Sequence, residues 1–488
     1  MPRAAHPTAT KSQVCAYYAH TCVIVGGVAA VLVLALVLVL AGATSARAAR
    51  AITTPVAAPP AYGVSTNGLF DRKGHFERKG KGHLGEIRAE GIEEGRSDAT
   101  WWWIEPKGPA GGAHHYVWDR HDRIVRSMAL NGLRWLPVLG YATRWSSTVK
   151  GTSYGAPRHA ADYAAYAGAV AARYGSRGTF WNENPTVPRL PVRAYEVWNE
   201  PNWEHFWRPA PNAARYAELL VAAAVAIRTA DPAATVVSGG LASPQSPTTF
   251  VRAMLAAQPS IPAVVDAVGY HPYARSGRAT IALVRGMRRA LDGAGASAMG
   301  IAVTEVGWTQ RASGRPESLP ESSRAGAYAL MTDALARGNC RVDRVVPFMW
   351  TRIDAVPQGD DWYAIAGGDG ALLSAGAAFA AGIARSAAPV AAAAPRVPSC
   401  DPAPETTYAP PLTLGLRLTS ASPGCVRARV TYRSHAVNDV RVAFSDGARR
   451  TTGTDGEVTH CGMRRGHASA SATADRVAAS PRVLVSVR

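Results

Sequence analysis

The stretch Ala-Tyr-Glu-Val-Trp-Asn-Glu-Pro-Asn, residues 194–202, is an apolar strand that ends abruptly in polar groups. Residues 300–308, Gly-Ile-Ala-Val-Thr-Glu-Val-Gly-Trp, repeat the pattern later in the chain. Short apolar runs of this kind alternate with segments of helical period from one end of a long stretch to the other. The runs lie at residues 132–139, 194–198, 234–238, 264–270, 301–306 and 342–350, with two more near Tyr62 and Ile92. Eight strand-helix units predict an α/β fold, a (β/α)8 TIM barrel over residues 61–385.

Two intervening segments illustrate the helical period. Apolar residues of segment 163–174 fall on one face, and Gly175 ends the segment. Segment 216–227 repeats the arrangement after Asn212, a residue type that favours the N-cap position. Both segments therefore predict helices whose apolar face packs on the barrel.

The pattern changes after residue 385. Residues 386–411 are rich in proline and alanine and predict a semi-rigid linker. From residue 412 to 488, apolar and polar residues alternate as in half-buried strands, and we expect hairpin turns at Asp446-Gly447 and Asp455-Gly456. This alternation predicts a small all-β immunoglobulin-like sandwich domain. Because no tryptophan follows Trp362, we expect this domain to act as a spacer or in cell-surface contact rather than in sugar binding.

The N-terminus predicts export. Residues 21–46 carry no charge, basic residues precede them, and residues 46–48 offer a small-x-small cleavage site. Residues 1–48 are therefore either a cleaved signal peptide or a signal anchor, and residues 49–60 form a tether. In both cases the rest of the chain is extracellular or at the cell surface, and it contacts the membrane only through this N-terminal segment.

Cysteine usage agrees with an oxidising compartment. Four cysteines follow the targeting segment, and none of them forms a Cys-x-x-Cys pair of the zinc-binding kind. Four cysteines permit three pairings. We favour Cys425 with Cys461 and Cys340 with Cys400.

Composition separates the remaining function classes. The chain has 488 residues, 47% hydrophobic and 18% charged, which is typical of a folded protein. Its net charge of +18 would suit a polyanion partner, but the basic residues are nearly all arginines, scattered and never in a run of five. With an export signal and no nucleic-acid-binding motif, we expect no nucleic-acid partner.

Two strand ends carry the chemistry. Glu200 follows the predicted fourth strand and Glu305 lies in the predicted seventh, so both face the mouth of the barrel, where active sites of this fold lie. A carboxylate pair is what glycosidic bond cleavage requires. A gap of ~5 to 5.5 Å between the carboxyl groups retains the anomeric configuration, and a gap of ~6.5 to 9.5 Å inverts it.

At this point the sequence resembles a known family. Trp198-Asn199-Glu200-Pro201 and Thr304-Glu305-Val306-Gly307-Trp308 are similar to the acid/base and nucleophile motifs of the retaining glycoside hydrolases of clan A, especially families 5 and 39. The resemblance extends over residues 62–385. It implies that Glu200 is the acid/base, that Glu305 is the nucleophile and that Asn199 contacts the sugar 2-hydroxyl.

Further positions follow the order of the clan's strands. Arg96 matches the second-strand arginine that positions the nucleophile, and His271 and Tyr273 match the sixth-strand His-x-Tyr pair. A structural salt bridge and a core histidine are the competing interpretations of Arg96 and His271. The chain departs from family 5 at Tyr141, where that family commonly has a histidine. Three tryptophans are predicted to contact the sugar, because indole faces bury the apolar faces of sugar rings: Trp203, Trp308 and Trp350. Trp350 ends the predicted eighth strand as the clan's platform tryptophan does, and simple core packing is its competing interpretation.

These observations predict an exported retaining glycoside hydrolase that cleaves β-glycosidic bonds in a polysaccharide or oligosaccharide by double displacement. No metal and no organic cofactor is expected. The alternative is a non-catalytic cell-surface protein that binds glycan through the same barrel. Release of product from an aryl β-glycoside or a polysaccharide would distinguish the enzyme from the binding protein.

Overall fold

The structure is a computed structural model that describes most of the barrel and of the C-terminal domain. The described residues are 60–76, 83–243, 245–310, 317–337, 340–351, 362–387, 415–432, 435–436, 440–453, 455–464, 466–473 and 483–487. The predicted signal segment, the predicted tether up to residue 59 and residues 388–411 of the predicted linker lie outside them, as does Cys400. Among the described helices, none is both long enough and apolar enough to span a bilayer.

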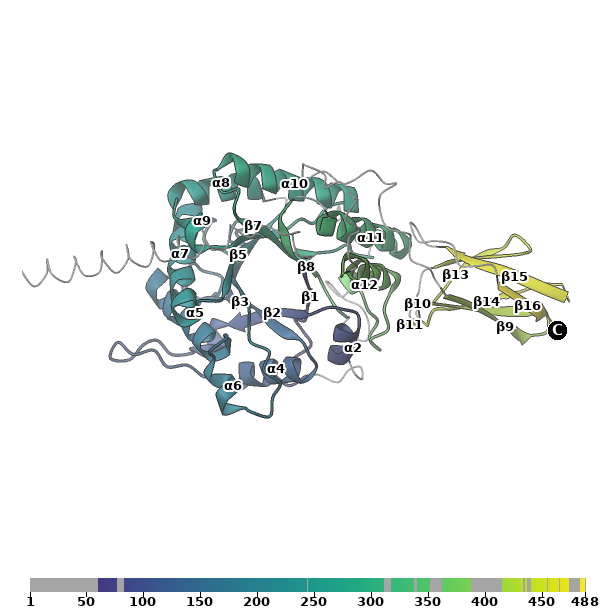
Figure 1. Cartoon of the computed structure of the whole chain (residues 1–488), viewed down its shortest axis with the longest axis horizontal. Helices are drawn as coiled ribbons and strands as arrows, with labels where there is room; N and C mark the ends of the chain where they lie inside the picture. Colours follow the sequence, from purple (N-terminus) through teal and green to yellow (C-terminus); the bar gives the residue numbers. More distant parts are fainter. Residues whose placement is uncertain are drawn as a thin grey trace, which may run out of the picture. The chain divides into compact units, whose positions relative to one another are not determined.

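The predicted barrel is confirmed: eight parallel strands pair in chain order, and β8 pairs with β1 to close the ring. Figure 1 shows the longer helices arranged around the outside of the strands. The strands are β1 Ala61–Ser65, β2 Glu94–Thr100, β3 Arg134–Gly140, β4 Ala194–Asn199, β5 Thr235–Ala242, β6 Ala267–His271, β7 Gly300–Val306 and β8 Val342–Pro347. The helices are α2 His83–Ala89, α3 Trp101–Ile104, α4 Asp119–Leu130, α5 Ala160–Tyr174, α6 Thr179–Glu183, α7 Ala213–Ala230, α8 Pro247–Ala257, α9 Ile261–Val264, α10 Gly277–Gly293, α11 Glu321–Arg337 and α12 Ser374–Ala387.

Several boundaries differ from the sequence prediction: β5 runs to Ala242, β8 ends at Pro347, and two further differences involve helices. The sixth strand starts at Ala267, because residues 261–264 form the short helix α9 with proline in its first turn. Helix α12 runs to Ala387, two residues into the segment predicted as linker. At both helices the apolar or alanine-rich composition suits a buried helix as well as the element that was predicted.

The predicted helix faces pack on the strands as expected. Tyr163 and Tyr216, on α5 and α7, are buried, and their hydroxyl groups donate to the backbone carbonyls of Leu139 and Val197. Asn212 caps α7, since its side chain accepts a hydrogen bond from the amide of Arg215 at 3.0 Å. The tyrosines thus tie the helices to the carboxyl ends of β3 and β4, which hold the site.

One layer of small and medium side chains fills the barrel interior below the mouth. Strands β3 to β8 each contribute one buried residue to it: Leu136, Ala194, Val237, Ala267, Ala302 and Val346. Arg96 on β2 pairs in register with Leu136 of this layer. Arg96 therefore lies level with this apolar layer, and a second buried ion pair, Arg344 with Glu94, lies two residues earlier on β8 and β2.

The C-terminal domain has two antiparallel four-stranded sheets, as predicted for a sandwich (Figure 1). Buried residues alternate along the central strands, as at Val426, Ala428 and Val430. One sheet contains β9 Gly415–Ser422, β10 Cys425–Tyr432, β11 His435–Ala436 and β14 Glu457–Cys461, and the other contains β12 Arg441–Phe444, β13 Arg449–Thr451, β15 Gly466–Thr473 and β16 Val483–Val487.

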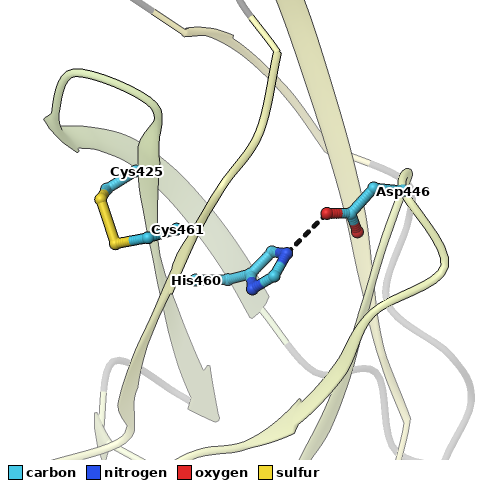
Figure 2. The surroundings of a disulfide bond; sticks show 4 residues. All are labelled: Cys425, Asp446, His460 and Cys461. Carbon is cyan, nitrogen blue, oxygen red and sulfur yellow. Dashed lines mark hydrogen bonds and ion pairs between the residues drawn. A yellow bond between two sulfur atoms is a disulfide. The ribbon is translucent and has the colours of Figure 1, made fainter.

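The predicted disulfide between Cys425 and Cys461 is confirmed (Figure 2). The two residues pair directly across β10 and β14, so the bond staples neighbouring strands of one sheet, whereas the immunoglobulin disulfide joins two sheets. A polar contact links the sheets instead: His460 Nε2 on β14 lies 2.6 Å from Asp446 Oδ2, in the turn between β12 and β13 of the other sheet (Figure 2). This hydrogen bond lowers the pKa of Asp446.

One of the two predicted hairpin turns is wrong. Asp446-Gly447 joins the paired strands β12 and β13, and Gly447 has the positive φ that such turns require. Asp455-Gly456 also forms a tight turn, but it joins β13 to β14, which lie in different sheets. An Asp-Gly pair fixes the local turn and leaves open which strands pair on its two sides.

Candidate active site

The predicted site residues converge at the carboxyl ends of the barrel strands. Glu200 is the first residue after β4, His271 is the last residue of β6, and Glu305 is the penultimate residue of β7. Arg96 reaches them from β2, and Tyr273 lies just beyond β6. Parallel strands of a closed barrel bring their carboxyl ends to one mouth, which explains why residues so far apart in the chain meet here.

Arg96 lies at the centre of the charged residues at the barrel mouth. Its side chain is 1% exposed and donates four hydrogen bonds. Nε and Nη2 form a bidentate pair with the carboxylate of Glu196, at 2.7 and 3.0 Å. Nη1 lies 2.6 Å from Glu305 Oε1, and Nη2 also donates to Asn199 Oδ1 at 3.0 Å. The planar guanidinium therefore fixes three acceptors from two strands in one geometry.

Glu305 is held as a carboxylate. Arg96 donates to one of its oxygens, and the Tyr273 hydroxyl donates to the other at 3.0 Å. Burial would raise the pKa of Glu305, but the charges of His271 and Arg96 and these hydrogen bonds outweigh burial and lower the pKa. An ionised carboxylate with both oxygens oriented suits nucleophilic attack.

The pKa of Glu200 is shifted in the opposite direction to that of Glu305. It is 6% exposed, and burial raises its pKa, although the hydrogen bond and charge of His271 oppose the rise. Its Oε1 lies 2.8 Å from His271 Nδ1. Burial also acts to lower the pKa of His271, but the charges of Glu305 and Glu200 raise it. Two carboxyl groups whose pKa values are shifted in opposite directions are the pattern of an acid and a nucleophile.

The two glutamates share one site. One carboxylate oxygen of Glu200, one of Glu305 and a ring nitrogen of His271 all lie within 4.8 Å of one another. His271 Nδ1 is 3.7 Å from Glu305 Oε2, so the imidazole bridges the pair. This spacing is closer to the ~5 to 5.5 Å between the carboxyl groups of retaining glycosidases than to the ~6.5 to 9.5 Å of inverting ones.

Local backbone geometry aims Glu200 at the site. Glu200 has φ 47° and Trp198 has φ 74°, both in the left-handed region that non-glycine residues seldom occupy. The Glu200 amide donates to the carbonyl of Gly240 at 3.0 Å, which fixes this turn against β5. A Cβ at Gly240 would stand 2.0 Å from His271 Nε2, so glycine there makes room for the imidazole.

Sequence reasoning missed Glu196 and Thr304. The Glu196 carboxylate neutralises Arg96 and accepts from the Thr304 hydroxyl and the Gly240 amide, both at 2.9 Å. The Thr304 hydroxyl also lies 3.2 Å from His271 Nε2. Glu196 and Thr304 thus connect Arg96, which binds Glu305, with His271, which binds Glu200. The available signal was a charged residue in the middle of an apolar strand, where only a buried partner makes it stable.

The predicted tryptophans do not behave alike. Trp203 is 40% exposed, but Trp308 and Trp350 are 0% and 1% exposed. Trp203 therefore has a ring face open to solvent in this structure, whereas Trp308 and Trp350 are covered, and their contact with sugar stays a prediction. Trp308 donates from Nε1 to the Ala274 carbonyl at 2.7 Å, which braces the segment after β6. Trp350 lies beyond the end of β8 rather than at it.

A half-buried phenylalanine is connected to Glu305 through two tyrosines. Phe348, directly after β8, packs edge-on against Tyr363, with ring centroids 5.9 Å apart. Tyr363 in turn contacts Tyr273 at 5.8 Å, and Tyr273 binds Glu305. Phe348 therefore packs behind Tyr363 and Tyr273 rather than directly on Glu305.

The donor set of Glu200, His271 and Glu305 could in principle reach one metal ion. A cation at that point would meet the guanidinium charge of Arg96, which lies 2.6 Å from Glu305. Both oxygens of Glu305 already accept hydrogen bonds, so the residues fit a proton-transfer pair better than a cation site.

Comparisons of the sequence find no match, whereas comparison of the structure finds similar folds. No protein-family profile matches the sequence, and no curated protein matches it significantly. Similar folds occur among solved structures. A family 39 β-xylosidase from Caulobacter crescentus shares 17% identity at a TM-score of 0.51, with 80% of this chain and 83% of that chain covered.

Two other solved structures give the same result. A family 39 glycoside hydrolase from Xanthomonas axonopodis pv. citri shares 15% identity at a TM-score of 0.51, covering 88% of this chain and 94% of that one. A glucosidase from Croceicoccus marinus shares 14% identity at a TM-score of 0.50, covering 83% and 94%. At this identity the likeness concerns the fold alone, and it agrees with the (β/α)8 barrel expected from the alternation of strands and helices.

Proposed function

We propose that this protein is a retaining β-glycoside hydrolase of the clan A type, acting on a polysaccharide or oligosaccharide. One observation carries the proposal: Glu200 and Glu305 meet within 4.8 Å at the barrel mouth with pKa values shifted in opposite directions. The similar folds are described as a β-xylosidase, a glucosidase and a family 39 enzyme, which supports a carbohydrate substrate.

The proposed reaction has two displacements. In the first, a Glu305 oxygen forms a bond to the anomeric carbon while the bond to the leaving oxygen breaks, and that oxygen takes the proton of Glu200. The covalent ester removes the charge of Glu305, which lowers the pKa of Glu200. In the second, Glu200 takes a proton from water, the water oxygen attacks the anomeric carbon, and Glu305 leaves as a carboxylate.

Four further residues have supporting roles in the proposed reaction. Arg96 and Tyr273 orient the Glu305 oxygens and favour the ionised form. His271 holds Glu200 through Nδ1. Asn199, the last residue of β4, accepts a hydrogen bond from Arg96, and its proposed role is to contact the 2-hydroxyl of the bound ring.

We also propose that the protein is exported and works outside the cell or at its surface. Uncharged residues 21–46 after a basic N-terminus support export, and the Cys425–Cys461 bond suits an oxidising compartment. A reporter that reads only outside the cytosol, fused after residue 60, should be active. Activity that is retained when residues 1–48 are deleted from the fusion would contradict the role of this segment.

The catalytic proposal is tested with a panel of aryl β-glycosides and by the NMR signal of the first anomer released. We expect a β product first, that is, retention. Glu305→Ala should abolish turnover, and azide should restore some of it as an α-glycosyl azide. Glu200→Gln should lose about 10²- to 10⁴-fold on poor leaving groups and less on good ones, since it removes the general acid. An α product first, or glycan binding with no product release, would contradict the proposal.

A further inference from the structure

A third acidic residue lies at the barrel mouth and takes no part in the proposed chemistry. Asp98 stands two residues beyond Arg96 on β2, so its side chain is on the same face of the strand, toward the barrel interior. Two residues of strand correspond to about 6.5 Å, which places Asp98 above Arg96 in the direction of the mouth. Register agrees, because Arg96 pairs with Leu136 of the interior layer and Asp98 with Val138.

The Asp98 carboxylate has no hydrogen-bond or ion-pair partner within the described part of the chain. Its backbone amide donates to Asn67 Oδ1 at 3.2 Å, which holds the strand and leaves the side chain unengaged. The side chain is half-buried, in contrast to the fully partnered Glu196 below it. A carboxylate that is partly withdrawn from water and has no partner loses solvation, and hydrogen-bond donors from a ligand would restore the lost interactions.

The space beside Asp98 is open. Gly140 is the next inward-facing residue after Val138 on β3, and a Cβ there would meet no described atom within 4 Å. The nearby charges are of both signs: Arg96 is ion-paired with Glu196 and Glu305, and the charges of Arg96 and Arg120 act on Asp98 against burial and the charges of Glu305 and Glu196. Of these three carboxylates, Asp98 is the one without an ion-pair partner among the described residues. Burial raises the pKa of Asp98 to about 6, which leaves it ionised at pH 7. An ionised carboxylate can only accept hydrogen bonds.

We propose that Asp98 accepts hydrogen bonds from ring hydroxyls of the sugar that Glu305 attacks, and that it makes the site select a neutral sugar over the corresponding uronic acid. The inference rests on the proposed function and deepens it. Hydroxyl groups supply the donors that the carboxylate lacks. A uronate carboxylate bound here would face the like charge of Asp98, which has no ion-pair partner in the described part of the chain, whereas Glu305 is paired with Arg96. The strongly positive net charge of the chain alone would have suggested the opposite preference.

The experiment compares wild type, Asp98→Asn and Asp343→Asn on 4-nitrophenyl β-xyloside, β-glucoside, β-glucuronide and the 3-deoxy and 4-deoxy glucosides. Asp343 is the matched control, because burial likewise raises its pKa to about 6, but it lies near the start of β8, at the other end of the barrel. We expect wild type to prefer the neutral glycosides. Asp98→Asn should lose about 10- to 100-fold in kcat/KM on them, the range for a hydrogen bond to a charged group.

Two readouts separate recognition from a structural effect. A deoxy position that lowers wild-type kcat/KM should cost Asp98→Asn much less, and the ratio of glucuronide to glucoside activity should rise in this variant but not in Asp343→Asn. Unchanged deoxy penalties, or an unchanged ratio, would overturn the inference while leaving the proposed hydrolase intact. A wild-type protein that hydrolyses none of the panel would refute the proposed function and this inference with it.

Discussion

Replacing Arg96 with methionine tests what this buried arginine contributes to stability and to the pKa of Glu305. The substitution keeps an apolar stem of similar length and removes a guanidinium that is 1% exposed and bonded to Glu196 and Glu305. Breaking a buried ion pair from one side typically costs about 3–5 kcal/mol of unfolding free energy, because the remaining carboxylates stay buried without a counter-charge. We expect a loss of that size.

The same substitution should shift the pH dependence of catalysis. The Arg96 charge and hydrogen bond help to lower the pKa of Glu305, so their removal raises that pKa. Glu305 must be ionised to attack, and the acidic limb of kcat/KM reports its pKa in the free enzyme. The acidic limb should therefore move to higher pH in Arg96→Met, with about 1.4 kcal/mol of lost stabilisation of the carboxylate for each unit moved.

Arg344→Met is the matched control. Arg344 is also a buried barrel arginine, paired with Glu94 at 2.6 Å, but it makes no hydrogen bond to either catalytic glutamate. Urea unfolding should show a similar loss of stability in both variants, whereas the acidic limb should move only in Arg96→Met. An unshifted limb in Arg96→Met, measured below its unfolding transition, would refute the role given to Arg96. An equal shift in both variants would also refute it.

Three further predictions follow from other parts of the structure. Gly240→Ala should displace His271, since a Cβ would lie 2.0 Å from its Nε2, and kcat should fall with the alkaline limb moved; an unchanged pH-rate profile would argue against it. Replacing Cys425 and Cys461 with serine should lower the unfolding free energy of the C-terminal domain by about 3–4 kcal/mol, the value that the chain-entropy model gives for a separation of 36 residues. If calorimetry shows the unfolding transition of this domain at the same temperature as in wild type, the prediction is wrong. Because the folded pKa of Asp98 is about 6 against a reference of 3.8, its ionised form destabilises the fold above pH 6 and costs nothing below pH 3.8; Asp98→Asn should raise unfolding free energy at pH 7 and not at pH 3, and equal effects at both would exclude the shift.

The sequence was most informative where local chemistry and position coincide. Apolar runs that stop at Glu200 and at Glu305 reveal strand ends, and a barrel brings strand ends together whatever lies between them. The helix faces and the cap at Asn212 were predictable for a similar reason, because each depends on residues within a few positions of one another.

What could not be predicted depends on partners distant in the chain. Glu196 sits in an apolar strand, and only the folded barrel shows that Arg96 neutralises it. Tryptophan type suggests a sugar platform, but the exposure of each ring is decided by what packs on it, which separates Trp203 from Trp350. The turn at Asp455-Gly456 is likewise correct locally, while the choice of sheet belongs to the whole domain.

The account depends most on Glu305 forming a bond to the sugar, and covalent trapping tests this directly. The protein would be incubated with an activated 2-deoxy-2-fluoro β-glycoside of whichever neutral sugar it cleaves best, then digested and mapped by mass spectrometry. We predict one added 2-fluoroglycosyl group on the peptide that contains Glu305, and none after Glu305→Ala. A label on any other residue, or a fully active enzyme that is never labelled, would contradict the account.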